Sequence, residues 1–101
     1  MNNPLLNLLG LAIRAGRLST GYPKSAESAK AGKAKLLIVA SDISAKTAKE
    51  AAFVCGKSNI PCHVIDVTSE ELSHAIGIKS GVVSVDDAGF AKKALSLIDN
   101  K

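Results

Sequence analysis

The chain has 101 residues, 47% of them hydrophobic and 22% charged, which suits one compact domain and excludes intrinsic disorder. Aromatic residues make up only 3% and Trp is absent, so aromatic platforms for stacking single-stranded bases are scarce. The net charge is +4, and because residues 1–36 hold six basic side chains and one acid, they carry +5 while the remainder carries −1.

The N-terminal part predicts a helix, a short strand and a second helix. Pro4 can start the first helix, and its apolar face has helical spacing. That face consists of Leu5, Leu8, Leu9, Ala12 and Ile13. Residues 17–20 form a short extended piece, and Pro23 fits the first turn of a helix that ends near residue 31.

Three strands are expected after residue 35. Residues 36–40 are a continuous apolar run, typical of a strand that is buried on both faces. Residues 62–67 follow Pro61 and form the next candidate strand, and residues 81–85 form the last.

Each of these strands is followed by a helix. Ser44 can cap the first of these helices and Gly56 can end it, while Ser69 can cap the second. The closing helix is marked by Phe90, Ala91, Ala94, Leu95 and Ile98. Because no linker or repeat interrupts the chain, we expect a single domain over residues 1–101, with a central sheet and helices on both of its faces.

The location of the protein follows from two further features. The apolar segment 5–13 is too short and too interrupted for a signal peptide or a membrane span. Cys55 and Cys62 have no companion pair, which favours reduced thiols. We therefore expect a cytoplasmic protein without membrane contact.

No catalytic or metal-binding constellation can be assembled. His63 and His74 lie at metal-ligand spacing neither from each other nor from the cysteines. Of the pair Asp86 and Asp87, one more plausibly caps the last helix than forms a catalytic dyad. We therefore expect no enzyme activity, no metal and no cofactor.

The basic segment between Arg17 and Lys35 is the most informative for function. A helix start offers unpaired amides and partial positive charge, which attract phosphates. Lys24 lies at such a start, where a cation costs from a few tenths to about 1 kcal/mol. Either this charge binds a polyanionic ligand, or Lys24 is simply a solvated surface residue.

Four segments in register resemble the kink-turn RNA-binding ribosomal-protein superfamily, of the archaeal ribosomal and box C/D type. They are LGLAIRAGRLSTG (9–21), AKLLIVASDIS (34–44), NIPCHVID (59–66) and ELSHAIGIKSGVVSV (71–85). The closing stretch DAGFAKKALSLID (87–99) is most similar to the bacterial YlxQ branch. The resemblance implies an α/β/α sandwich with a small mixed sheet of about four strands, and it implies structured RNA as the partner. We expect the protein to be a monomer.

By the same resemblance, RNA is bound at the start of the second helix and by two loops. The helix start comprises Gly21, Tyr22, Pro23, Lys24 and Glu27, with Lys30, Lys33 and Lys35 as flanking charge. The loops comprise Ser41, Asp42 and Ile43, and Ile78, Lys79, Ser80, Gly81 and Val82.

One departure from the family pattern falls within these residues. Kink-turn binders carry Asn-Glu-x-x-Lys at the helix start, whereas this chain has Pro23-Lys24-x-x-Glu27. The features that attract phosphate are retained better than those that read bases, and phosphate contacts position a protein without specifying sequence. Two functions remain open. One is binding of kink-turn-like or ribosomal RNA, with ribosomal proteins as further partners. The other is a protein-interaction module that kept the fold but lost kink-turn recognition.

Overall fold

The computed structural model describes residues 3–99, which form five helices and four strands in alternation. In chain order these are α1 (Pro4–Arg14), β1 (Leu18–Thr20), α2 (Tyr22–Lys30), β2 (Leu36–Val39), α3 (Ala45–Ser58), β3 (Cys62–Val64), α4 (Ser69–Ile76), β4 (Val82–Val85) and α5 (Ala88–Asp99). The order expected from the apolar periodicity is confirmed.

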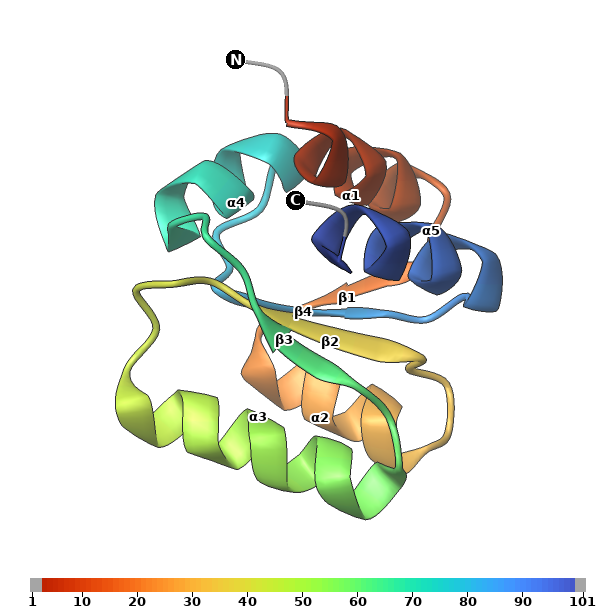
Figure 1. Ribbon diagram of the computed structural model, residues 1–101, viewed down its shortest axis with the longest axis vertical. Coiled ribbons are helices and arrows are strands. Elements are labelled where there is room, and N and C mark those ends of the chain that lie inside the picture. Colours follow the sequence, from red (N-terminus) through yellow and green to blue (C-terminus); the bar gives the residue numbers. More distant parts are fainter. Residues whose placement is uncertain (1–2, 100–101) are drawn as a thin grey trace.

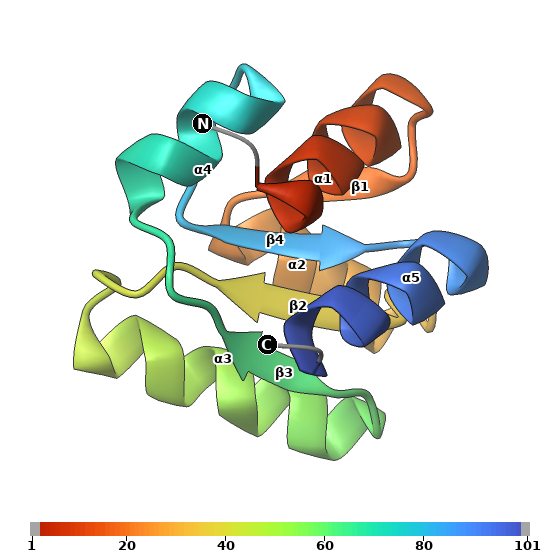
Figure 2. The ribbon, with the colours of Figure 1, turned by 45° about the horizontal axis from the view of Figure 1, so that its top comes forward.

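The four strands form one mixed sheet in the order β1-β4-β2-β3 (Figure 2). β4 pairs antiparallel with both of its neighbours, β1 and β2, whereas β2 and β3 are parallel. The last strand in the sequence therefore lies between the first two, and a segment near residue 82 comes beside segments near residues 20 and 39.

Helices cover both faces of the sheet, which confirms the three-layer α/β/α sandwich (Figure 1). α1, α4 and α5 lie on one face, and α2 and α3 lie on the other. β2 shows why both faces are apolar: Leu36 and Ile38 point into the first layer, Leu37 and Val39 into the second. All four are buried, since successive side chains of a strand point to opposite faces.

Two helix boundaries differ from the sequence prediction. α3 does not stop at Gly56 but continues to Ser58 and ends at Asn59, which adopts the left-handed conformation with φ 62°. Asparagine tolerates this conformation because its side chain is short and polar. The cap of α4 is Thr68 rather than Ser69, because Thr68 and Glu71 form a capping box.

Other local predictions are confirmed. The Ser44 hydroxyl accepts the amide of Thr47 (3.2 Å) at the start of α3. The Asp87 carboxylate accepts the amide of Phe90 (2.9 Å) at the start of α5, so one of the two neighbouring aspartates does cap the last helix. β3 is shorter than expected, because only residues 62–64 pair with β2.

Candidate nucleic-acid interface

Three segments that are distant in the sequence meet at one end of the sheet. Gly21 follows the end of β1, residues 41–43 follow the end of β2, and residues 78–81 precede β4. The antiparallel register pairs Thr20 with Val83 and Val39 with Val82, which places these three segments side by side. The helix start and both loops of the sequence prediction therefore share one end of the molecule.

The start of α2 is joined directly to the loop before β4. The amide of Gly21 donates to the carbonyl of Val82 (2.8 Å) and to the hydroxyl of Ser80 (2.9 Å). Gly21 has φ 86° and ψ 151°, a conformation that side chains disfavour, so glycine suits this corner. α2 begins without a side-chain cap, and Pro23 has no amide hydrogen. The first turn therefore offers outward-directed donors at Tyr22 and Lys24.

The loop after β2 packs on the loop before β4. A Cβ on Gly81 would overlap the side chains of Ile43 and Ser69, so both would have to shift to make room for a larger residue. The amide of Ala40 also donates to the carbonyl of Gly81 (2.9 Å). Ile43 is half-buried against both apolar layers.

Asp42 is engaged with the protein itself. Its carboxylate accepts the hydroxyl of Ser69 (2.7 Å) and the amide of Ser69 (2.8 Å). These hydrogen bonds favour the ionised form and lower the pKa of Asp42 below its usual value. The neighbouring Ser41 amide donates to the carbonyl of Val67 (2.8 Å). Asp42 and Ser41 thus anchor this loop to the start of α4.

Within the loop before β4, buried residues support the residues that face solvent. Ser80 is buried, its amide donates to the Ser73 hydroxyl (2.8 Å), and its own hydroxyl donates to the carbonyl of Val82 (2.7 Å). Val82 is buried as well, whereas Ile78 is 49% exposed and Lys79 is also exposed. Ile78 and Lys79 are therefore the side chains of this loop that a ligand could contact.

The basic side chains that were predicted to bind RNA line two separate hollows of the surface. Lys24 and Glu27 line a polar hollow of about 750 Å³, together with Lys33 and Lys35. Arg17, which sequence reasoning counted as charge but did not assign to the site, lines the same hollow. Lys30 lies instead beside the groove between α2 and α3. The signal that could have found Arg17 is its position immediately before β1, in the basic part of the chain.

Asp86 links the buried face of α2 to the sheet through hydrogen bonds. Its carboxylate accepts hydroxyl hydrogen bonds from Ser19 of β1 (2.5 Å), Ser28 of α2 (2.7 Å) and Ser84 of β4 (2.9 Å). Ser28 and Ser84 are buried, so α2 meets the sheet through hydroxyls that need this acceptor. The Ser28 bond is the one that joins α2 itself to Asp86, in the second half of the helix, while the other two bonds join Asp86 to β1 and β4.

The described part of the chain offers little for catalysis or metal binding. Among residues 3–99, no three His, Cys, Asp or Glu side chains gather where they could hold a metal ion. Burial raises the pKa of the Cys55 thiol to about 12 and also raises the pKa of Cys62, so neither is an activated nucleophile. No helix in residues 3–99 has the length and apolar character needed to cross a membrane.

Known proteins resemble this chain over most of its length. The family model for the ribosomal protein L7Ae/L30e/S12e/Gadd45 family matches residues 4–95. An RNA-binding protein YlxQ of Enterococcus faecium is 36% identical over 94 residues, covering 93% of this chain and 90% of that protein. The large ribosomal subunit protein eL30 of Candida glabrata is 31% identical over 83 residues, covering 80% of this chain and 79% of that protein.

A solved structure of similar shape is a protein of unknown function from Bacillus halodurans C. It superposes with a TM-score of 0.92 at 37% identity, covering 97% of this chain and 99% of that one. The matches in sequence and in structure both extend over nearly the whole domain. This chain therefore belongs to the ribosomal protein L7Ae/L30e/S12e/Gadd45 family.

Proposed function

We propose that the protein binds structured RNA without catalysis, through the end of the sheet where the start of α2 meets the two loops. The observation that carries this proposal is the convergence of these three segments, to which the family resemblance attributes RNA binding. The amides of the first turn of α2 suit phosphate oxygens, and Lys24 supplies positive charge beside them. The names of relatives as RNA-binding and ribosomal proteins support the same conclusion.

The finer proposal is a kink-turn-like or ribosomal RNA, bound by a monomer in the cytoplasm as a ribosome-associated protein. Lys24 and Glu27 are both exposed on α2, so the exchange of acid and base relative to the family motif alters the surface rather than the core. The retained features recognise backbone and shape, and we expect affinity for the bent phosphate backbone to exceed base discrimination.

A salt-dependent titration tests the proposal. A kink-turn RNA and an unkinked duplex of equal length are titrated with the protein at several salt concentrations. Binding should weaken steeply with salt, because each neutralised phosphate contributes a slope of roughly −0.7 to −0.9 in log K against log salt. Absence of binding at low salt, or binding without salt dependence, would overturn the proposal.

Charge reversal at the helix start locates the site. Lys24→Glu should weaken binding at least about tenfold and reduce the salt slope by about one. Lys93→Glu is the matched control, because Lys93 is also exposed but lies on α5, on the opposite face of the sheet. Equal effects of the two substitutions would mean that only net charge matters.

A protein-interaction module is the second candidate, favoured by the altered residues Pro23, Lys24 and Glu27. Co-purification distinguishes the two functions. Nuclease-sensitive association with ribosomes supports RNA binding, whereas nuclease-resistant association with one protein supports the second candidate.

A further inference from the structure

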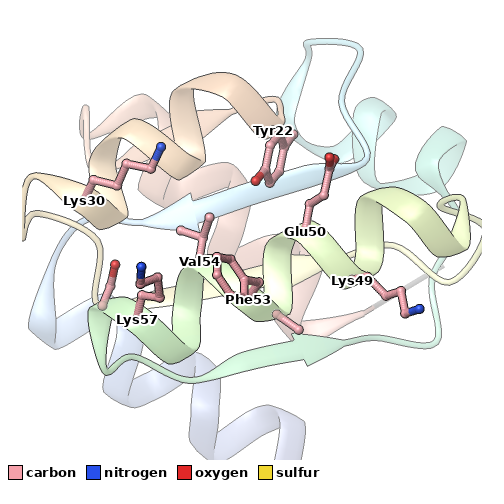
Figure 3. Close-up of a pocket in the computed structure, with 9 residues that line it drawn as sticks. Tyr22, Lys30, Lys49, Glu50, Phe53, Val54 and Lys57 are labelled. Atoms are coloured by element: carbon pink, nitrogen blue, oxygen red, sulfur yellow. The ribbon is translucent and has the colours of Figure 1, made fainter.

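An open groove runs between α2 and α3, on the outer face of the layer that these helices form. Its volume is about 1190 Å³ (Figure 3). Its lining is Tyr22, Lys30, Lys49, Glu50, Ala52, Phe53, Val54, Lys57 and Ser58. Tyr22 and Lys30 belong to the RNA site that was expected from the sequence, whereas no residue of α3 (Ala45–Ser58) was expected in that site.

The apolar part of the groove is aromatic. Phe53 is 66% exposed, although the neighbouring Val54 is buried, so its ring does not serve the core. Tyr22 lies across the groove at the start of α2 and packs against the second apolar layer. These are two of the three aromatic residues in the chain, and both border one groove. Exposed rings of this kind are what a nucleobase stacks on.

The charge around the rings favours a polyanion. Three lysines and one acid line the groove, and Lys30 and Lys57 stand at its end away from Tyr22 and Glu50 (Figure 3). The Lys57 ammonium lies over the Phe53 ring, 5.4 Å from its centre, so this ring face already attracts a cation. A base that stacks on this face would take the place of the flexible lysine, whose ammonium could then turn to the phosphate. A phosphate would be repelled at Glu50 and attracted at the end with Lys30 and Lys57.

The groove is continuous with the proposed RNA site. A smaller hollow of about 380 Å³, lined by Tyr22, Pro23, Ala26, Glu27 and Lys30, shares Tyr22 and Lys30 with the groove. An RNA strand that contacts the start of α2 can therefore continue along this helix into the groove while staying on the protein surface.

We propose that the α2–α3 groove binds an unpaired nucleotide that flanks the structured RNA, with the base stacked on Phe53 and the phosphate held by Lys30 and Lys57. This inference rests on the proposed function and extends it to a second contact surface. Stacking tolerates every base, so the groove would add affinity for single-stranded flanks without a sequence requirement.

Fluorescence of the RNA tests this inference. One kink-turn RNA carries a three-nucleotide single-stranded extension with 2-aminopurine, and a second RNA lacks the extension. 2-Aminopurine fluorescence falls when the base stacks, so wild-type protein should quench it and should bind the extended RNA more tightly. Phe53→Ala should abolish the quenching and lower affinity for the extended RNA by roughly five- to a hundredfold, the loss expected for one stacked base.

Further variants test the role of Lys57 and control for loss of an exposed apolar side chain. Lys57→Gln should reduce the salt slope for the extended RNA only. Leu11→Ala is the matched control, because Leu11 is also an exposed apolar residue (52%) but lies on α1, on the other side of the sheet. Phe53 is mostly exposed, so its loss should leave the fold intact, which the unfolding midpoint verifies.

The outcomes separate the two proposals. If wild type binds neither RNA, the proposed function fails. If wild type binds both RNAs with equal affinity and without quenching, the RNA function stands and the groove proposal is overturned. If Phe53→Ala instead abolishes a nuclease-resistant association with one protein and leaves RNA affinity unchanged, the groove is a protein-docking surface and the nucleotide proposal is again overturned.

Discussion

Replacing Asp86 with alanine tests how α2 is held on the sheet. The carboxylate accepts hydroxyl hydrogen bonds from Ser19, Ser28 and Ser84, which belong to three different elements. Asp86→Ala removes the acceptor of all three at once. Ser84 is fully buried and Ser28 is 7% exposed, so water cannot readily replace the carboxylate at these two hydroxyls.

The magnitude follows from the burial of each hydroxyl. An unsatisfied buried donor costs about 1–3 kcal/mol, which applies to Ser28 and Ser84. Ser19 is half-buried and regains water, so its loss adds about 0.5–1 kcal/mol. The free energy of unfolding should therefore fall by about 2.5–7 kcal/mol. Asp86→Asn keeps an oxygen acceptor without the charge and should cost only about 1–2 kcal/mol.

Urea unfolding followed by circular dichroism measures the effect. With an m value of about 1.5 kcal/mol/M, Asp86→Ala should lower the midpoint by roughly 2–5 M. Asp87→Ala is the matched control, because its carboxylate accepts one amide hydrogen bond at the start of α5, and loss of such a cap costs about 1 kcal/mol. If Asp86→Ala shifts the urea midpoint no further than Asp87→Ala does, the three hydroxyl hydrogen bonds to Asp86 do not stabilise the packing of α2 and the sheet.

Three further substitutions or measurements test other contacts. Gly81→Ala should destabilise the fold by about 1–3 kcal/mol, because the new Cβ would meet Ile43, and adding Ile43→Val should recover part of the loss in urea unfolding. An NMR titration should give Asp42 a pKa below its usual value, so its stabilising contribution is present at neutral pH and is lost as the pH falls through that lowered pKa. Ser69→Ala should raise the pKa of Asp42, and an unchanged pKa would contradict the hydrogen bonds from Ser69 as the cause. The pKa of Cys55, at about 12, leaves roughly one thiolate in ten thousand at pH 8, so a thiol reagent should modify Cys55 only after unfolding. Rapid modification of Cys55 itself in the native protein, located by peptide mass mapping because Cys62 is also free, would refute its burial.

Much of the fold could be predicted from local patterns. The apolar run Leu36–Val39 and the helical spacing after Pro4 each depend on a few neighbouring residues, and both elements form as expected. Capping by Ser44 is likewise a local property. The errors were at ends such as Gly56, where a glycine that could end a helix does not, because α3 continues to a left-handed Asn59.

The candidate site was predicted by resemblance, and its function remains a proposal. What the sequence determined by itself is the uneven charge and the presence of a helix start at Gly21, since both are properties of consecutive residues. It also contained the exchanged motif at Pro23, Lys24 and Glu27, which needs no structure to be seen.

Only the tertiary structure decided which of these residues are neighbours. The strand order β1-β4-β2-β3 brings Gly21 to Ser80 and Ile43 to Gly81, and it joins Asp86 to hydroxyls of β1 and α2. The same packing separates Lys30, beside α3, from Lys33 and Lys35 in the polar hollow, and leaves Phe53 exposed in the groove that Tyr22 also lines. The physical reason is that periodicity reports which face of one element is apolar, whereas pairing between distant strands depends on how all the apolar faces are buried together.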